Sequence, residues 1–207
     1  MDLFQQICLH PVVAIIRGAD PATVPDIVRA LQSGGVRAVE VTYNSPGALS
    51  LVEKLAVDFG GDMLIGMGTI LDTEQARAAL DAGARFLISP HFNPDVISLT
   101  RQRGGLSIPG AFTPTEIVNA YQAGGQLIKL FPASGNWNYV RELRAPLPHI
   151  PLMPTGGVSL DNIRQFREAG ATAFGIGTAL VNTSEKVTEA TLSRITDRAV
   201  QFTRAVQ

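Results

Sequence analysis

One of the three lysines in this chain lies in an apolar segment, where a charged amine is costly. Lys54 and Lys186 stand in polar stretches with helical spacing, whereas Lys129 interrupts the run Leu127–Pro132, which is typical of a buried strand. Burial disfavours the charged form of an amine and lowers its pKa, so the neutral amine becomes available as a nucleophile. Such an amine forms Schiff bases with carbonyl compounds, which makes Lys129 the first candidate for chemistry.

Glu40 is the one acidic residue inside a strand-like apolar run, Ala38–Thr42. The alternation of a strand would place Glu40, Thr42 and Asn44 on one face and the apolar residues between them on the other. If the first face lines the same interior as Lys129, Glu40 is placed to act as a general acid and base. Two alternatives stay open: a structural ion pair, and a Lys129 side chain that extends from the strand end to solvent.

Glycines end the last two apolar runs of the chain. Gly156-Gly157 follows one of them, and Gly177-Thr178 closes the other. Glycine lets a backbone approach an anion closely, and backbone N–H groups at a helix N-terminus bind phosphate oxygens. We therefore expect a phosphate site at these residues, with ordinary tight turns as the alternative.

Other apolar runs also end in residues that could contact a ligand. Arg17 ends the first run and Thr69 the third, and a guanidinium with a hydroxyl would hold a carboxylate, although a structural role is equally compatible. Pro90 ends the fourth run, where we expect it to shape a pocket wall. The three histidines show no metal-ligand spacing, so we expect no metal site and no cofactor.

The apolar runs recur at intervals of roughly 20–26 residues and alternate with amphipathic stretches. We expect strands at Val12–Arg17, Ala38–Asn44, Leu64–Ile70, Phe86–Pro90, Leu106–Phe112, Leu127–Ala133, Leu152–Gly157 and Ala173–Leu180. We expect helices near Pro21–Gln32, Ala48–Phe59, Thr73–Ala82, Pro94–Gln102, Thr115–Gln122, Asn138–Leu143, Leu160–Glu168 and Val187–Ala205. A further helix, Asp2–Leu9, is expected before the first strand.

Glycines that suit the end of a helix repeat in every second unit, within residues 33–35, 82–84, 123–125 and 169–171. Eight βα units favour a single (β/α)8 TIM barrel with an extra N-terminal helix, rather than an open doubly wound sheet. We expect this barrel to form one domain over residues 1–207. The active site of a barrel lies at the carboxyl ends of its strands, which is where the candidate residues fall.

Composition argues against several classes of function. The formal net charge is −1, so nothing indicates binding to nucleic acid or to an acidic membrane surface. Cys8 is the only cysteine, which excludes a disulfide framework and a cysteine metal cluster. No stretch has the pattern of a signal segment or of a membrane span, and we expect a cytoplasmic protein.

Six motifs in order make the chain resemble the 2-keto-3-deoxy-6-phosphogluconate/4-hydroxy-2-oxoglutarate (KDPG/KHG) aldolases, which are class I pyruvate aldolases. The resemblance extends from Val12 to about Val181. The motifs are Glu40–Thr42 with Ser45-Pro46, Gly66–Thr69, Ile88–Pro90, Ile108–Gly110, Ile128–Ala133 and Pro154–Gly157.

The resemblance implies a barrel enzyme that forms a homotrimer and uses no metal. It implies that Lys129 forms the Schiff base and that Glu40 is the general acid and base. It places Thr69 near the carboxylate of pyruvate and Thr155 in the pocket. The residues that it assigns to phosphate binding are Gly156, Gly157, Gly177 and Thr178.

The resemblance also implies a substrate, a phosphorylated keto-deoxy sugar acid that is cleaved to pyruvate and glyceraldehyde 3-phosphate. Asn44 stands where many gluconate-type members carry arginine. With Arg17 on the first run, the pattern is more similar to the 2-dehydro-3-deoxy-6-phosphogalactonate aldolases, and Arg17 would then bind the carboxylate. The alternatives are a phosphosugar isomerase or epimerase and a non-catalytic barrel that binds a phosphorylated ligand, neither of which needs a buried Lys129.

Overall fold

A computed structural model describes all of residues 1–207. The strands are β1 (Val12–Ile16), β2 (Ala38–Thr42), β3 (Leu64–Gly68), β4 (Phe86–Ile88), β5 (Leu106–Ile108), β6 (Gly110–Ala111), β7 (Ile128–Leu130), β8 (Leu152–Pro154) and β9 (Phe174–Ile176). The helices are α1 (Leu3–Leu9), α2 (Val24–Ser33), α3 (Ala48–Phe59), α4 (Thr73–Asp81), α5 (Pro94–Gln102), α6 (Pro114–Gln122), α7 (Trp137–Arg144), α8 (Ile163–Glu168) and α9 (Glu189–Ala205). Every hydrogen-bonded strand pair is parallel.

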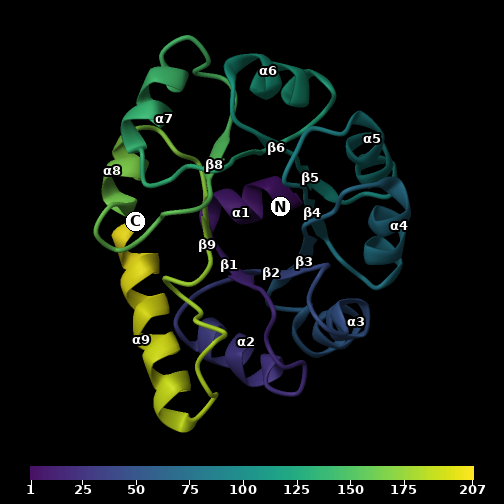
Figure 1. Cartoon of the computed structure of the whole chain (residues 1–207), viewed down its shortest axis with the longest axis vertical. Helices are drawn as coiled ribbons and strands as arrows, with labels where there is room; N and C mark the ends of the chain where they lie inside the picture. The colour runs from purple at the N-terminus through teal and green to yellow at the C-terminus, as the bar shows by residue number, and fades with distance from the viewer.

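The strands form two parallel sheets that curl around a common interior (Figure 1). The larger sheet has six strands in the order β5-β4-β3-β2-β1-β9, and the smaller has three in the order β6-β7-β8. Helices α2 to α9 lie outside the strands, while α1 lies behind the centre of the ring in this view (Figure 1). No helix is both long enough and apolar enough to cross a membrane.

The run Leu106–Phe112 was expected to be one strand, and the structure divides it at Pro109 into β5 and β6. Proline has no N–H to donate to a strand ladder, so pairing is interrupted there. The N–H of Ser89 donates to Ile108 O at 3.2 Å on one side, and the N–H of Lys129 donates to Pro109 O at 2.9 Å on the other. The chain therefore changes its pairing partner at Pro109, which separates the two sheets on this side.

On the opposite side, the N–H groups of Thr172 and Ala173, just before β9, donate to Leu152 O of β8 at 2.8 and 3.4 Å, and one isolated parallel bridge also links the two sheets. It joins Thr155, just after β8, to Gly175 of β9. The curled, all-parallel arrangement agrees with the predicted alternation of strands and helices, although it has nine strands in two sheets rather than eight in one.

Local sequence signals explain several helix boundaries. The side chain of Asp2 accepts a hydrogen bond from the N–H of Gln5 at 2.7 Å, and Gln5 reaches back to the N–H of Asp2, so a capping box begins α1 where the sequence predicted a helix. The glycines predicted to end helices include four with φ between +89° and +103°, a left-handed conformation that suits glycine. They are Gly35, Gly83, Gly124 and Gly170.

Strand alternation sorts the buried side chains into two cores. One lies between the sheets and the helices, and an inner cluster of 11 residues fills the space that the sheets enclose. The strand-borne or strand-adjacent members of the inner cluster are Val13, Ala38, Leu64, Phe86, Ile88, Leu106, Ile108, Leu127, Met153 and Ala173. Ile7 of α1 completes this cluster and closes the amino end of the interior. Glu40, Lys129 and Thr155 each follow a member by two positions, so they lie on the same face nearer the carboxyl ends of the strands.

Candidate active site

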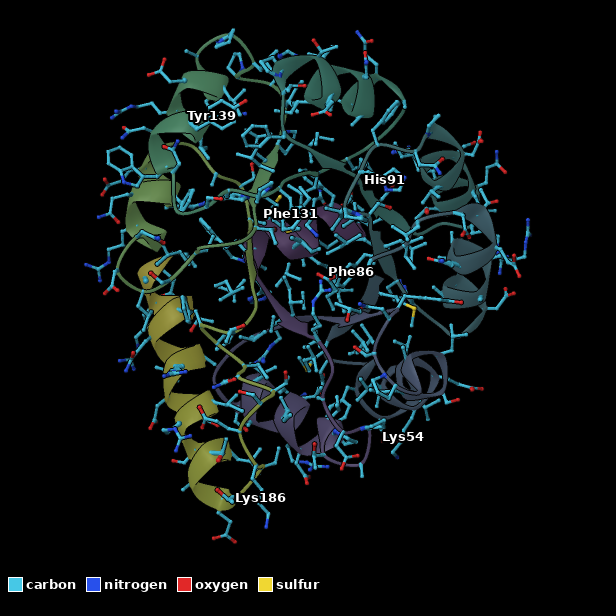
Figure 2. The ribbon with its side chains drawn as sticks, viewed as in Figure 1. Lys54, Phe86, His91, Phe131, Tyr139 and Lys186 are labelled. Carbon is cyan, nitrogen blue, oxygen red and sulfur yellow. The ribbon has the colours of Figure 1, made fainter.

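Lys129 lies on β7 and is buried, with 4% of its surface exposed. Its Nζ lies 4.7 Å from the ring centre of Phe131, which is labelled near the middle of Figure 2. Lys54 and Lys186 instead lie at the periphery of the molecule, near α3 and α9 (Figure 2). The burial of Lys129 contradicts the alternative of a side chain that extends to solvent.

The surroundings of Lys129 favour its neutral form. Burial lowers the pKa of Lys129 below that of an ordinary lysine. The negative charge of Glu40 acts against this shift, and the positive charge of Arg17 adds to it. A lowered pKa increases the fraction of neutral amine near neutral pH, and the neutral amine is the form that attacks a carbonyl carbon.

Glu40 lies on β2 with 1% of its surface exposed, and neither of its carboxylate oxygens has a hydrogen-bond partner. Burial raises the pKa of Glu40, while the positive charges of Lys129 and Arg17 oppose the rise. Glu40 is in none of the salt bridges, so the structural ion pair considered from the sequence is absent. A buried carboxyl group with no hydrogen-bond partner is costly to the fold, which is compatible with the predicted role of Glu40 as a general acid and base.

The neighbouring strand β3 leaves space for the carboxylate of Glu40. In the parallel register Glu40 pairs with Gly66 and Thr42 pairs with Gly68. A Cβ atom built on Gly68 would overlap Oε1 of Glu40. The side chain of Glu40 therefore occupies a volume that is open only because residue 68 is glycine.

Arg17 and Thr69 meet at the carboxyl ends of β1 and β3. Nη2 of Arg17 donates a hydrogen bond to Thr69 Oγ1 at 3.4 Å, and β2, which carries Glu40, lies between these two strands. Thr69 has a φ of +61°, a left-handed conformation that is unfavourable for a β-branched residue. Strained residues concentrate at functional sites, so this geometry is compatible with the predicted carboxylate site.

Pro90 adjoins the strand pair that carries Lys129. A Cβ atom on Gly110 would overlap the backbone of Pro90, so the two segments are in close contact. Gly110 in turn pairs with Lys129 in the register of β6 and β7. This placement is compatible with the predicted role of Pro90 in the pocket wall.

Asn44 lies beyond the strand that was expected to orient it. The strand β2 ends at Thr42, and the N–H of Ser45 donates to Thr42 O at 2.9 Å, so the chain turns before the alternation reaches Asn44. Asn44 is exposed and lies in this turn. The face argument for Asn44 was therefore wrong in its geometry, and its contact with substrate stays a prediction.

A pocket of about 390 Å³ lies over the ends of β1, β8 and β9. Its lining includes Arg17, Phe131, Thr155 and the four predicted phosphate-binding residues Gly156, Gly157, Gly177 and Thr178. The backbone N–H groups of those four residues donate to no other group of the chain, which leaves them free for an anion. Phe131 connects this pocket to Lys129, since its ring contacts the amine from the pocket side.

Comparison with known proteins decides the family. A family model described as KDPG and KHG aldolase matches residues 4–197. The chain belongs to the KDPG/KHG aldolase family. A probable 2-dehydro-3-deoxy-6-phosphogalactonate aldolase of Rhizobium meliloti is 37% identical to this family member over 83% of this chain and 82% of that protein.

Solved structures similar to this KDPG/KHG family member share its whole fold. One, of native KDPGal, has a TM-score of 0.88 at 31% identity and covers 94% of this chain and 93% of that one. Another is a KDPG aldolase from Legionella pneumophila with pyruvate captured at low pH as a covalent carbinolamine intermediate. It has a TM-score of 0.85 at 25% identity and covers 97% of each chain.

Three residues of this KDPG/KHG family member adjoin the candidate site but were not predicted as site residues. Phe131 had a usable signal, because it follows Lys129 at the two-residue spacing of one strand face. Ser45 and Thr183 contact the backbone around Arg17, and no sequence pattern indicates contacts between such distant segments. No group of three or more His, Cys, Asp or Glu side chains is arranged to hold a metal ion.

Gly68→Ala should reduce the aldolase kcat by roughly a hundredfold or more, because the new methyl group displaces the carboxylate of Glu40. The measurement is the steady-state cleavage rate of a purified variant whose circular dichroism matches the wild type. Gly61→Ala is the matched control, since a Cβ atom on Gly61 meets nothing within 4 Å. Wild-type kcat in Gly68→Ala would show that the position of the carboxylate is unimportant.

Proposed function

We propose that this protein is a class I aldolase that cleaves a 2-keto-3-deoxy-6-phospho sugar acid to pyruvate and glyceraldehyde 3-phosphate. The observation that carries the proposal is the buried Lys129 and the unpartnered Glu40 next to a pocket with free glycine amides. Membership in the KDPG/KHG aldolase family supports the same reaction. A homotrimer is part of this proposal and rests on the family resemblance.

We infer further that the two sheets act together as a (β/α)8 barrel. Only Pro109 separates β5 from β6, so these two strands would occupy one position of the barrel. The bridge between Thr155 and Gly175 would close the ring between β8 and β9. Lys129, Glu40 and the glycine loops then share the carboxyl end, where barrel enzymes hold their substrates.

The first half of the reaction forms an electron sink on Lys129. The neutral amine attacks the C2 ketone of the substrate, and the resulting carbinolamine loses water to give an iminium ion. Glu40 has a raised pKa, so a protonated fraction is available to donate the proton that leaves with the water. The carboxylate of Glu40 that remains is then the base for the next step.

The second half breaks the C3–C4 bond. Glu40, directly or through a water molecule, removes the proton of the C4 hydroxyl, and the electron pair of the C3–C4 bond moves into the iminium. Glyceraldehyde 3-phosphate leaves, and an enamine of pyruvate remains on Lys129. Glu40 returns its proton to C3 of the enamine, and hydrolysis of the iminium releases pyruvate and the free amine, with the proton that this step frees returning to Glu40.

The two ends of the substrate are held away from the bond that breaks. Arg17 and Thr69 would bind the carboxylate next to the C2 carbon, where their contact at the ends of β1 and β3 places them. The amides of the pocket over β8 and β9 would bind the phosphate at the other end. Binding at both ends orients the C2 carbon toward Lys129.

Borohydride reduction in the presence of pyruvate tests the proposal. A reducible iminium should form, so the wild-type enzyme should lose activity and carry one reduced pyruvyl group on the peptide that contains Lys129. A phosphosugar isomerase or epimerase, or a barrel that only binds a phosphorylated ligand, would not be labelled. Absence of a covalent adduct at saturating pyruvate would overturn the Schiff-base assignment.

The galacto-configured substrate should be preferred over its gluco epimer, because Asn44 stands where many gluconate-type members carry arginine, and the wall near the C4 hydroxyl would then differ. The placement of one hydroxyl contributes about 1–3 kcal/mol, or roughly 5- to 150-fold in kcat/KM. Steady-state cleavage of both epimeric 6-phosphates measures this ratio. Arg17→Ala should raise KM for both epimers alike, since both carry the carboxylate, and a gluco preference would contradict the assignment.

A further inference from the structure

The single peptide group that follows Arg17 is held at both its carbonyl and its N–H by hydroxyl groups from distant parts of the chain. The hydroxyl of Thr183 donates to the backbone carbonyl of Arg17 at 2.7 Å. The N–H of Gly18 donates to the hydroxyl oxygen of Ser45 at 2.9 Å. Because these contacts lie immediately after the Cα atom of Arg17, they set the direction in which its side chain leaves the backbone.

Ser45 connects this segment to the strand that carries Glu40. The hydroxyl groups of Ser45 and Thr42 are 2.8 Å apart and share a hydrogen bond. Thr42 is completely buried at the end of β2, two positions after Glu40. The hydroxyl of Ser45 therefore fixes the backbone after Arg17 relative to the buried end of β2.

Thr183 connects the same segment to the loop that follows the predicted phosphate site. The N–H groups of Leu180 and Val181 both donate to Gly177 O at 2.9 Å, so a tight turn leads from the pocket toward Thr183. Asn182 then accepts hydrogen bonds from the N–H and the hydroxyl of Ser184. The turn at Gly177 leads the chain to Thr183, whose own hydroxyl makes the contact with Arg17.

The side chain of Arg17 has little else to orient it. It is exposed, and its one hydrogen bond is the 3.4 Å contact with Thr69, which is at the long end of the accepted range. Gly18 has a φ of +67°, so the chain turns sharply directly after Arg17. The orientation of the guanidinium group therefore depends on how rigidly the backbone turn at Gly18 is held.

We propose that Thr183 and Ser45 are positioning residues that hold the Arg17 turn between β2 and the phosphate loop, so that the guanidinium group is ready to bind the substrate carboxylate. This inference rests on the proposed function, because it takes Arg17 as the group that binds the carboxylate. The segment from Gly177 to Thr183 would then serve both ends of the substrate. Gly177 would bind the phosphate, and Thr183 would hold the turn that carries Arg17 beside the carboxylate.

Thr183→Val removes the hydroxyl and keeps the shape of the side chain. It should raise the pyruvate concentration needed for half-maximal borohydride labelling by roughly 2- to 10-fold, the usual effect of losing one hydrogen bond. It should raise KM in the cleavage assay and change kcat little. Thr183→Ser restores the hydroxyl and should return both values to the wild-type range.

Ser184→Ala is the control for loosening of the loop. Ser184 bonds to Asn182 in the same turn and does not contact Arg17, so its loss should leave the pyruvate concentration for half-maximal labelling unchanged. An equal effect of Ser184→Ala and Thr183→Val would show that general loop order, and not the contact with Arg17, is responsible. That result would overturn the proposal.

A double-mutant cycle between Thr183→Val and Arg17→Ala makes the test specific. If Thr183 acts through Arg17, Thr183→Val should have no further effect in the Arg17→Ala background. Additive effects, or wild-type labelling in Thr183→Val, would refute the positioning role. Failure of the proposed function has a different result, because wild-type protein would then not be labelled with pyruvate at all.

Discussion

Lys129→Arg and Lys129→Met should each lower kcat for aldol cleavage by roughly ten-thousandfold or more, with no borohydride-trapped pyruvate adduct. Arginine stays charged and cannot form the imine, and methionine has no amine. Methionine is unbranched and of similar length, so it should fill the space beside Phe131 without a buried charge. Mass spectrometry of the reduced protein and the steady-state rate of purified, folded variants measure both effects.

Lys54→Arg provides the matched control for Lys129→Arg. Lys54 is exposed and pairs only with Asp58 at 2.8 Å on the same helix, so the same chemical change there should leave cleavage and labelling at wild-type levels. Cleavage near the wild-type rate by a folded Lys129 variant would contradict the Schiff-base mechanism. Labelling that persists in Lys129→Met would assign the imine to a different amine.

The position of Lys129 was predictable because the cost of burying a charge is visible in a sequence. A lysine between isoleucine and leucine in a strand-like run is unusual whatever the fold, and the structure buries it as expected. Glu40 was predictable for the same reason. Their shared interior followed from the alternation of strands combined with the βα repeat, since residues two apart on one strand face the same side and the strands of a barrel enclose one interior.

The local chain path was predicted less well, because it depends on contacts that periodicity does not encode. The predicted strand Leu106–Phe112 contained Pro109, whose missing N–H divides it in the structure. The predicted strand through Asn44 ended early because Ser45 turns back onto Thr42. Proline in the first case, and a hydroxyl contact in the second, outweighed the hydrophobic pattern.

Long-range packing was also beyond the sequence argument. Gly68 belongs to a recognised motif, but the reason that glycine is needed appears only when β3 lies beside the carboxylate of Glu40. The contact between Thr183 and Arg17 joins residues 166 positions apart in the chain. Single-sequence patterns describe one element at a time, and such contacts arise only when the elements are assembled.

Glu40→Gln should lower kcat by roughly a hundredfold or more, the usual contribution of a general acid–base residue. The amide fills nearly the same volume beside Gly68, so the variant should fold, and removal of a buried carboxylate with no hydrogen-bond partner should not lower its thermal stability. An amide cannot remove the C4 hydroxyl proton or return a proton to the enamine. Imine formation on Lys129 should be affected less, because the amine remains and no longer has a carboxylate nearby that raises its pKa.

Two measurements separate these steps. Exchange of the methyl protons of pyruvate with solvent reports proton transfer to and from the enamine, and borohydride labelling reports the imine alone. Glu40→Gln should slow the exchange strongly while labelling persists, whereas Glu116→Gln, at an exposed carboxylate that caps α6, should leave both unchanged because glutamine also supports that cap. Exchange at the wild-type rate in Glu40→Gln would mean that another group is the base. Loss of labelling together with exchange would instead show that dehydration to the iminium depends wholly on Glu40, and the assignment of the C4 hydroxyl proton to it would lose its support.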